Sequence, residues 1–305
     1  MTEKTRHHRS ADGRSPDPAE PVRLALENVT VGYDGDPIIR DLTLDLPHLE
    51  FTAIIGPNGC GKSTLLKTFS RMLRPSQGRV LVDGRDMSRM STKRIARAVG
   101  VLPQSPINPE GITVADLVSR GRYPHQHILS QFSAADERAV DDALIHTGLA
   151  ELAGARLDEL SGGQRQRAWI AMVLAQDTRV MLLDEPTTFL DVSTQADVLD
   201  LCASLHARGR TLVAVLHDLN MAARYATHVI AMKSGSVITR GHPEDVFTLD
   251  MLREVFDLDA RILRDPDTGR PLIVPRTRRG AARRDGPSTA HDPSDKPDNP
   301  REEQP

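Results

Sequence analysis

Residues 56–64 read Gly56-Pro57-Asn58-Gly59-Cys60-Gly61-Lys62-Ser63-Thr64. This stretch follows an apolar run, Phe51–Ile55, and precedes a segment with helical spacing of apolar residues, Leu65–Leu73. The order of strand, glycine-rich turn and helix is the context in which a phosphate-binding loop occurs. Glycines let consecutive backbone N–H groups converge on phosphate oxygens, and the following helix adds the positive end of its dipole. The stretch therefore predicts a loop that binds a nucleoside triphosphate.

Three side chains of this loop carry more specific expectations. Lys62 is expected to place a positive charge on the β- and γ-phosphates, and the Ser63 hydroxyl is expected to be a ligand for Mg²⁺. Cys60 has two open interpretations. Its position before a helix and close to Lys62 favours a reactive thiolate, whereas a small residue there could simply fill space.

Length and composition exclude several classes of protein. The 305 residues carry a formal net charge of −3, which gives no overall attraction to nucleic acid. The two cysteines, Cys60 and Cys202, argue against a disulfide framework and against a thiolate zinc site. The first twenty residues lack the apolar core of a signal peptide, and no apolar run approaches the roughly 18 residues that span a bilayer. We therefore expect a cytoplasmic protein that reaches a membrane only through a partner.

The pattern of apolar residues divides the chain into a core and two tails. Residues 1–21 and 276–305 are polar and proline-rich, and both predict disorder. Alternating residues in Val22–Tyr33 and Leu42–Leu46 predict an antiparallel pair of strands. Helical patterns then alternate with apolar runs, which predicts a doubly wound α/β core. These runs are Val99–Leu102, Val180–Leu183, Thr211–Leu216 and Val229–Met232.

Two carboxylates, Asp184 and Glu185, end the apolar run Val180–Leu183. The carboxyl end of a strand in an open α/β sheet lies beside the phosphate loop. Asp184 is then expected to join the Mg²⁺ shell and Glu185 to act on the attacking water. Such a pair is only a moderate signal alone, because many strands end in an acidic turn. Beside a phosphate loop, it predicts hydrolysis of the nucleotide.

A second glycine-rich turn, Ser161-Gly162-Gly163-Gln164, precedes the helical pattern Arg165–Ala175. Alone, this turn would be interpreted as an ordinary helix cap. Together with the phosphate loop and the Asp184–Glu185 pair, it resembles the ATP-binding subunit of ABC transporters. The resemblance implies a P-loop ATPase core over residues 22–275, with an N-terminal antiparallel β-subdomain and an inserted helical signature subdomain at about 105–175.

The same resemblance implies roles for single residues. In the family, the Ser161–Gln164 turn completes the ATP site of the other protomer in a head-to-tail homodimer. Gln104 resembles the glutamine that joins the Mg²⁺ and water shell, and His217 resembles the histidine that contacts the γ-phosphate. Asp191 resembles an aspartate at the dimer interface, and Tyr33 resembles the aromatic residue that stacks on adenine. Each of these would be an ordinary loop or strand-end residue if it stood alone.

Three further segments are similar to ATPases that import ferric siderophores: Thr113–Gln126, Arg165–Gln176 and Asp265–Gly269. Importers of cobalamin or haem remain an alternative, and a soluble ABC-type ATPase that acts on nucleic acid is disfavoured because the chain has one cassette and no cysteine cluster. The resemblance implies a peripheral subunit on the cytoplasmic face of the membrane. Its expected partners are a second copy, permease subunits and a periplasmic or lipid-anchored substrate-binding protein, with no nucleic acid.

Overall fold

The computed structural model describes residues 24–33, 35–106, 109–126 and 132–276. The described residues up to Pro275 form one compact unit. The expected leader at 1–21 lies outside the described residues, as does the expected tail apart from Arg276. Disorder in these segments therefore stays a prediction.

The strand before the phosphate loop, β3 (Phe51–Ile55), lies inside a six-stranded sheet of order β10-β9-β3-β8-β7-β6. All its residues are buried, and they alternate between two hydrophobic cores, with Phe51 in the first and Ile54 in the second. Burial on both faces is typical of a parallel strand covered by helices. The other strands are β6 (Val99–Leu102), β7 (Val180–Leu183), β8 (Thr211–Val215), β9 (His228–Lys233) and the antiparallel β10 (Ser236–Gly241). The predicted α/β core is confirmed.

A four-stranded antiparallel sheet covers the second core. Its order is β2-β1-β4-β5, formed by β1 (Leu24–Val31), β2 (Ile39–Leu46), β4 (Gln77–Val82) and β5 (Arg85–Asp86). The predicted pairing of the first two strands is confirmed, with Leu24 opposite Leu46. Leu24 and Leu26 point into the core that also contains Leu65 and Phe69 of the helix after the phosphate loop.

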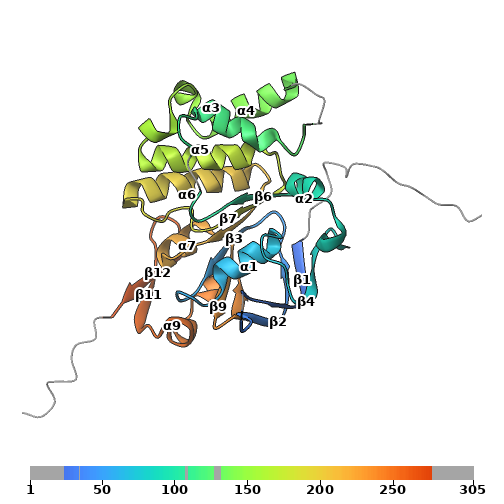
Figure 1. Cartoon of the computed structure of the whole chain (residues 1–305). Coiled ribbons are helices and arrows are strands. Elements are labelled where there is room, and N and C mark those ends of the chain that lie inside the picture. The colour runs from blue at the N-terminus through green and yellow to red at the C-terminus, as the bar shows by residue number, and fades with distance from the viewer. Residues whose placement is uncertain (1–23, 34, 107–108, 127–131, 277–305) are drawn as a thin grey trace, which may run out of the picture. The chain divides into compact units, whose positions relative to one another are not determined.

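The helices divide between the two cores. The second core contains α1 (Lys62–Phe69) and α2 (Thr92–Ala98). The first core contains α3 (Val114–Ser119), α4 (Ala134–His146), α5 (Gly162–Ala175), α6 (Val192–Ala207), α7 (Leu219–Tyr225), α8 (Pro243–Val246) and α9 (Leu249–Phe256). Figure 1 shows α3, α4 and α5 stacked together on the side of the sheet away from α1. Short 3₁₀ turns are η1 (Met87–Arg89), η2 (Arg120–Arg122), η3 (Ala150–Leu152) and η4 (Leu157–Glu159).

A buried ion pair holds the α3–α5 group together. Arg122 Nε donates to Asp136 Oδ1 at 2.8 Å, and Arg122 also donates to the Ala175 carbonyl at 2.7 Å. One side chain thus ties η2, α4 and the end of α5. Trp169 of α5 packs in the same core and is largely buried.

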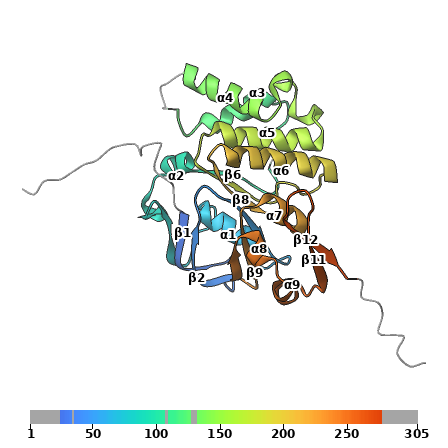
Figure 2. The same cartoon turned by 180° about the vertical axis from the view of Figure 1, so that it is seen from behind.

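The structure differs from the sequence-based expectations at three places. Helix α1 ends at Phe69 rather than near Leu73, because Arg71 adopts a left-handed conformation with φ of 60°; Met72 is consequently exposed. The apolar patterns did not predict β10, nor the hairpin of β11 (Ala260–Arg264) and β12 (Pro271–Pro275). The reverse view in Figure 2 shows this hairpin near α7 and α9.

Replacement of Arg122 by alanine should leave the Asp136 carboxylate buried without its cation. We expect the free energy of unfolding to fall by about 3–5 kcal/mol, the usual loss when one partner of a buried pair is removed. The matched control is Arg79→Ala, because Arg79 pairs with Glu27 on the surface. That change should cost less than about 1 kcal/mol. Urea denaturation followed by circular dichroism compares the two, and equal losses would contradict the assignment.

The same pair predicts a dependence of stability on pH. Burial by itself raises the pKa of Asp136. Hydrogen bonds from Ser133 and Arg122 together lower the pKa by more than burial raises it, so the net pKa is about 2. This value lies below the roughly 3.9 of an unfolded chain. The carboxylate therefore contributes its full stability above about pH 4 and loses it as the pH falls toward 2. Arg122→Ala should weaken this loss of stability on acidification.

Candidate active site

Close packing at two glycines shapes the phosphate loop. Gly56 has a φ of 156°, and a Cβ atom there would lie 2.3 Å from the carbonyl oxygen of Met232 in β9. Gly61 caps the N-terminus of α1 with a φ of 106°, in the left-handed region that favours glycine. The loop can therefore pass close to β9 and enter α1 in one tight turn, with the N-terminal N–H groups of α1 following it.

The side chain of Lys62 lies within the loop. Its Nζ donates to the carbonyls of Gly56 and Pro57, each at 2.9 Å, and the residue is almost fully buried. The positive charge is therefore fixed at the turn where phosphate groups would bind.

Cys60 is also buried in this loop. Burial raises the pKa of the Cys60 thiol, and this effect exceeds the lowering by the charge of Lys62. The expectation of a thiolate favoured by Lys62 and the helix is therefore wrong, because the thiol is desolvated. Its place in the second core supports the other interpretation, a small residue that fills space.

A hydrogen bond between Ser63 and Asp184 connects the start of α1 to the end of β7. Ser63 Oγ donates to Asp184 Oδ1 at 2.9 Å, and Asp184 is nearly inaccessible to solvent. Burial raises the pKa of the Asp184 carboxyl, the hydrogen bond from Ser63 lowers it, and the charge of Glu185 raises it, with a net increase. Two oxygen donors of the kind that Mg²⁺ prefers thus lie in contact beside the loop.

Glu185 is the centre of a hydrogen-bonded cluster. It adopts a φ of 54°, in the left-handed region. Its Oε1 lies 2.7 Å from His217 Nε2, and its Oε2 accepts from Thr188 Oγ1 at 3.0 Å. Burial raises the pKa of Glu185, but hydrogen bonds from His217, Gln104 and Thr188 together leave it below its usual value. Glu185 is therefore a carboxylate at neutral pH, with its acceptor oxygens held in place.

Sheet order explains why these residues meet. The strands β3, β8, β7 and β6 are consecutive neighbours and parallel. At the same edge of the sheet, β3 leads into the phosphate loop and β8 precedes His217. Asp184 and Glu185 follow β7, and Gln104 follows β6. Sequence reasoning identified these residues separately, whereas it missed Thr188, whose only signal is a hydroxyl three positions after Glu185.

The Ser161–Gln164 turn lies elsewhere in the fold. Ser161 Oγ accepts from the backbone of Gln164 at 3.2 Å, and the Gln164 side chain accepts from the Ser161 N–H at 3.0 Å, which caps α5. Ser161 and Gly162 are exposed. Because α5 packs in the first core and α1 in the second, the structure does not bring this turn together with the phosphate loop of the same chain.

Asp191 lies beside this turn and caps α6. Its carboxylate accepts from Ser193 Oγ at 2.7 Å, and from the backbone N and Oγ1 of Thr194, each at 2.9 Å. These hydrogen bonds lower the pKa of Asp191 to about 2. A Cβ atom at Gly163 would lie only 2.2 Å from Thr194 Cγ2, so the turn and the Asp191 loop are packed tightly together.

Tyr33 lies beside α1, two residues after the end of β1. Lys67 Nζ donates to the Tyr33 hydroxyl at 3.3 Å and lies 5.8 Å from the ring centre. About half of the residue's surface, 53%, is exposed. The ring is therefore partly accessible to a ligand near the helix that follows the phosphate loop.

The fold and the loop geometry together define a P-loop nucleotide-binding protein. A model of the family described as ABC transporter matches residues 39–188. The ferric enterobactin transport ATP-binding protein of Escherichia coli is 48% identical over 88% of this chain and 98% of its own length. A probable siderophore transport system ATP-binding protein of Bacillus subtilis is 46% identical over the same shares. The hemin import ATP-binding protein of Shewanella denitrificans is 36% identical over 82% of this chain and 100% of its own.

Solved structures of ABC transporter proteins are also similar to this chain. A chain of a metal-chelate type ABC transporter in an inward-facing conformation matches with a TM-score of 0.72 and 29% identity, over 83% of this chain and 97% of its own. A dimeric bacterial ABC transporter cassette matches with a TM-score of 0.63 and 27% identity, over 72% and 98%. The chain belongs to the ABC transporter family of ATP-binding proteins, and it is an ATPase that binds ATP. Among the described residues, no helix has the length and apolar character to cross a membrane.

Replacement of Gly163 by alanine should force its new methyl group against Thr194. We expect the free energy of unfolding to fall by about 1–3 kcal/mol, the usual cost of overpacking. Thr194→Ser removes the clashing Cγ2 and keeps the hydroxyl that binds Asp191. The double variant should recover most of the loss in thermal or urea unfolding. A double variant as unstable as Gly163→Ala would show that Thr194 is not the obstacle.

Proposed function

We propose that this chain is the ATP-hydrolysing subunit that energises import of a ferric siderophore through a separate membrane permease. The Glu185 cluster beside the phosphate loop carries the hydrolytic part of this proposal. The cargo part is supported by 48% identity to a ferric enterobactin transport subunit, compared with 36% to a hemin import subunit. Cobalamin or haem import is the alternative cargo, and a non-transport ATPase is the less supported alternative function.

The phosphate loop binds ATP through backbone and side-chain groups. The backbone N–H groups of the loop, other than at Pro57, and the charge of Lys62 bind the β- and γ-phosphates, while the exposed ring of Tyr33 stacks on adenine. Ser63 and Asp184 fit a magnesium ion, because their oxygens are in hydrogen-bond contact and a bound cation would offset the cost of burying the Asp184 charge. Gln104 completes this oxygen set. When bound, Mg²⁺ neutralises negative charge on the phosphate oxygens.

Glu185 is the catalytic carboxylate. Its lowered pKa keeps it ionised, so it can accept a hydrogen bond from the water that attacks the γ-phosphate in line. His217 donates to Glu185 at 2.7 Å, and its side chain is 42% exposed, so from this place beside Glu185 it remains accessible to the γ-phosphate. Charges and dipoles fixed around the transferred group provide most of the catalysis in phosphoryl transfer.

A second copy of the chain completes the site. The Ser161–Gln164 turn forms the exposed N-terminus of α5, which packs in the first core. The phosphate loop of the same chain leads into α1, which packs in the second core. In a head-to-tail dimer, this turn and Asp191 of one protomer face the nucleotide of the other. The similarity to a dimeric ABC cassette supports this arrangement.

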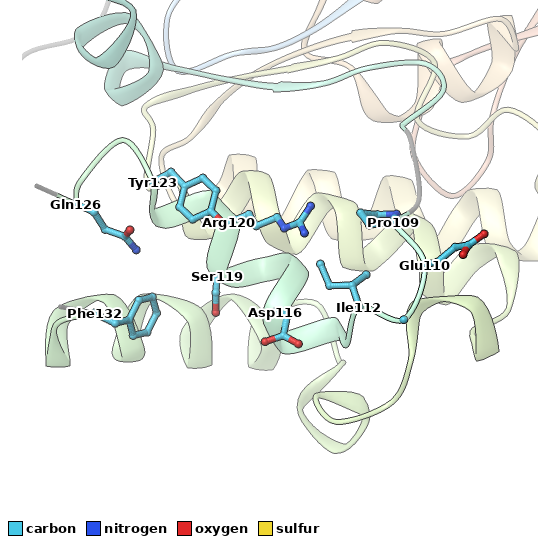
Figure 3. Close-up of a pocket in the computed structure, with 10 residues that line it drawn as sticks. Pro109, Glu110, Ile112, Asp116, Ser119, Arg120, Tyr123, Gln126 and Phe132 are labelled. Carbon is cyan, nitrogen blue, oxygen red and sulfur yellow. The ribbon is translucent and has the colours of Figure 1, made fainter. Parts of the chain in front are cut away.

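The permease docks in a groove of the α3–α4 region. A cavity of about 460 Å³ is lined by residues of the 109–112 loop, α3, η2 and the turn after it, and by Phe132 just before α4. Figure 3 shows Tyr123 and Arg120 on one side of this cavity and Phe132 and Asp116 on another. Exposed Tyr123 and Phe132 provide apolar contact for a helix of the permease. Through this contact the chain lies on the cytoplasmic face of the membrane, and a periplasmic or lipid-anchored protein delivers the substrate.

Replacement of Glu185 by glutamine keeps the shape of the side chain but removes its charge and proton acceptor. Steady-state ATP hydrolysis should fall by about 10²–10⁴-fold. Nucleotide binding should survive, because Lys62, Ser63 and Asp184 are unchanged. Unhydrolysed ATP should then trap the closed dimer, which size-exclusion chromatography detects as a shift from monomer to dimer. The control Lys62→Ala should lose ATP binding and show no shift, and near-normal turnover of Glu185→Gln would refute the assignment.

The cargo assignment is tested in cells. Deletion of the gene should abolish uptake of a ferric siderophore, measured with radiolabelled iron for one siderophore at a time. The wild-type gene should restore uptake, whereas the Glu185→Gln variant should not. If every ferric siderophore enters normally and cobalamin or haem uptake is lost instead, the cargo is cobalamin or haem and the siderophore assignment is wrong.

A further inference from the structure

The C-terminal hairpin β11–β12 is joined to the helix that follows His217. The Asn220 side chain makes two hydrogen bonds to one residue of the hairpin. Its Oδ1 accepts from the Ile273 N–H at 2.7 Å, and its Nδ2 donates to the Ile273 carbonyl at 3.2 Å. The amide thus provides at one residue the paired donor and acceptor that a neighbouring strand would provide. Asn220 is partly buried and lies in the first turn of α7.

On the basis of the role proposed above for His217, we propose that Asn220 is a positioning residue for ATP hydrolysis, which holds His217 against Glu185 by anchoring the start of α7 to the hairpin. Only two residues, Asp218 and Leu219, separate Asn220 from the histidine. A displacement of the first turn of α7 therefore moves His217 directly.

The connection between Asn220 and His217 is rigid. Asp218 Oδ1 accepts from the backbone N–H groups of Asn220 and Met221 at 2.8 and 2.9 Å, which fixes the cap of α7. The hairpin is fixed in turn, because Ile273 is buried in the same core as Ala222 and Ala223 of α7. The anchored cap leaves His217 Nε2 at 2.7 Å from Glu185 Oε1.

Other bonds of the hairpin lie farther from His217. Arg224 at the far end of α7 pairs with Asp265 at 3.2 Å, and its side chain is half exposed. Arg270 pairs with Glu244 of α8 at 3.1 Å. These pairs attach the hairpin to the body of the protein without touching the cap of α7. They provide matched controls, because their loss removes a contact of the hairpin but leaves the two hydrogen bonds between Asn220 and Ile273 in place.

The first test compares steady-state kinetics of Asn220→Ala with those of Arg224→Ala. Because a small misplacement of a catalytic group can cost up to about 100-fold, we expect Asn220→Ala to lower kcat by about 10–100-fold. The KM for ATP should stay within about twofold, since the phosphate loop is untouched. Arg224→Ala should keep both parameters within about twofold. An unchanged kcat in Asn220→Ala, or an equal loss in Arg224→Ala, would overturn the proposal.

A second variant, Asn220→Asp, tests the proposal if Asn220→Ala fails to fold. Asn220→Asp keeps the oxygen that accepts from the Ile273 N–H and removes the donor to its carbonyl. Its loss of kcat should lie between that of wild type and that of Asn220→Ala. Thermal melting of each variant establishes that activity is measured on folded protein. A kcat at the wild-type level in the folded aspartate variant would also count against the proposal.

Double variants separate positioning from general loosening of the fold. If Asn220 acts through His217, the variant His217→Ala/Asn220→Ala should hydrolyse ATP at the rate of His217→Ala alone in single-turnover experiments. Multiplied losses would show that Asn220 acts independently of the histidine. If His217→Ala itself hydrolyses ATP normally, the proposed role of His217 fails. If only His217→Ala is slow and the Asn220 variants are normal, the role of His217 stands and the positioning role fails.

Discussion

The register of the parallel strands constrains everything at the catalytic edge of this protein. Hydrogen bonding places Ile54 of β3 beside Val215 of β8, and Leu183 of β7 beside both Ala214 and Leu102. The phosphate loop, His217, Glu185 and Gln104 follow within a few residues of these pairs. A slip of one residue in any strand would move its side chains to the opposite face and withdraw one functional group from the edge. Each side chain of these strands fits a close-packed core, so a slip would force side chains of different shape into each position. The two hydrophobic cores therefore also hold the geometry of this edge.

Adjacent carboxylates at this edge have opposite electrostatic environments. Burial raises the pKa of Asp184, which accepts a hydrogen bond from Ser63, whereas three neighbouring donors hold the pKa of Glu185 below its usual value. Carboxylates whose environments differ in this way commonly have different chemical roles. A nearby cation would relieve the cost of the buried Asp184 charge, and Glu185 is already stabilised as an acceptor. Glu185 adopts a backbone φ of 54°, and its carboxylate oxygens lie within hydrogen-bond distance of His217 and Thr188.

The sequence predicted those parts of the molecule that obey local rules. The runs at 51–55 and 180–183 are buried on both faces, and their boundaries match the strands β3 and β7. The end of α1 was less predictable, because Arg71 adopts a left-handed conformation that its residue type does not favour. The apolar pattern did not predict the hairpin β11–β12, because the hairpin has few buried residues and is held by a hydrogen bond to the distant Asn220. Thr188 and the raised pKa of Cys60 depend on tertiary packing, which no local pattern encodes.

Trp169 is the single tryptophan of the chain, and it lies in α5 within the helical group tied by Arg122 and Asp136. Its indole is largely buried, while α1 and the phosphate loop belong to the other core. Intrinsic fluorescence of the unmodified protein therefore comes, at tryptophan wavelengths, from this helical group alone. Changes in its emission during a catalytic cycle would follow the surroundings of the Ser161–Gln164 helix as nucleotide or a second protomer arrives. The native chain thus contains a site-specific optical probe of the helix that begins with the Ser161–Gln164 turn.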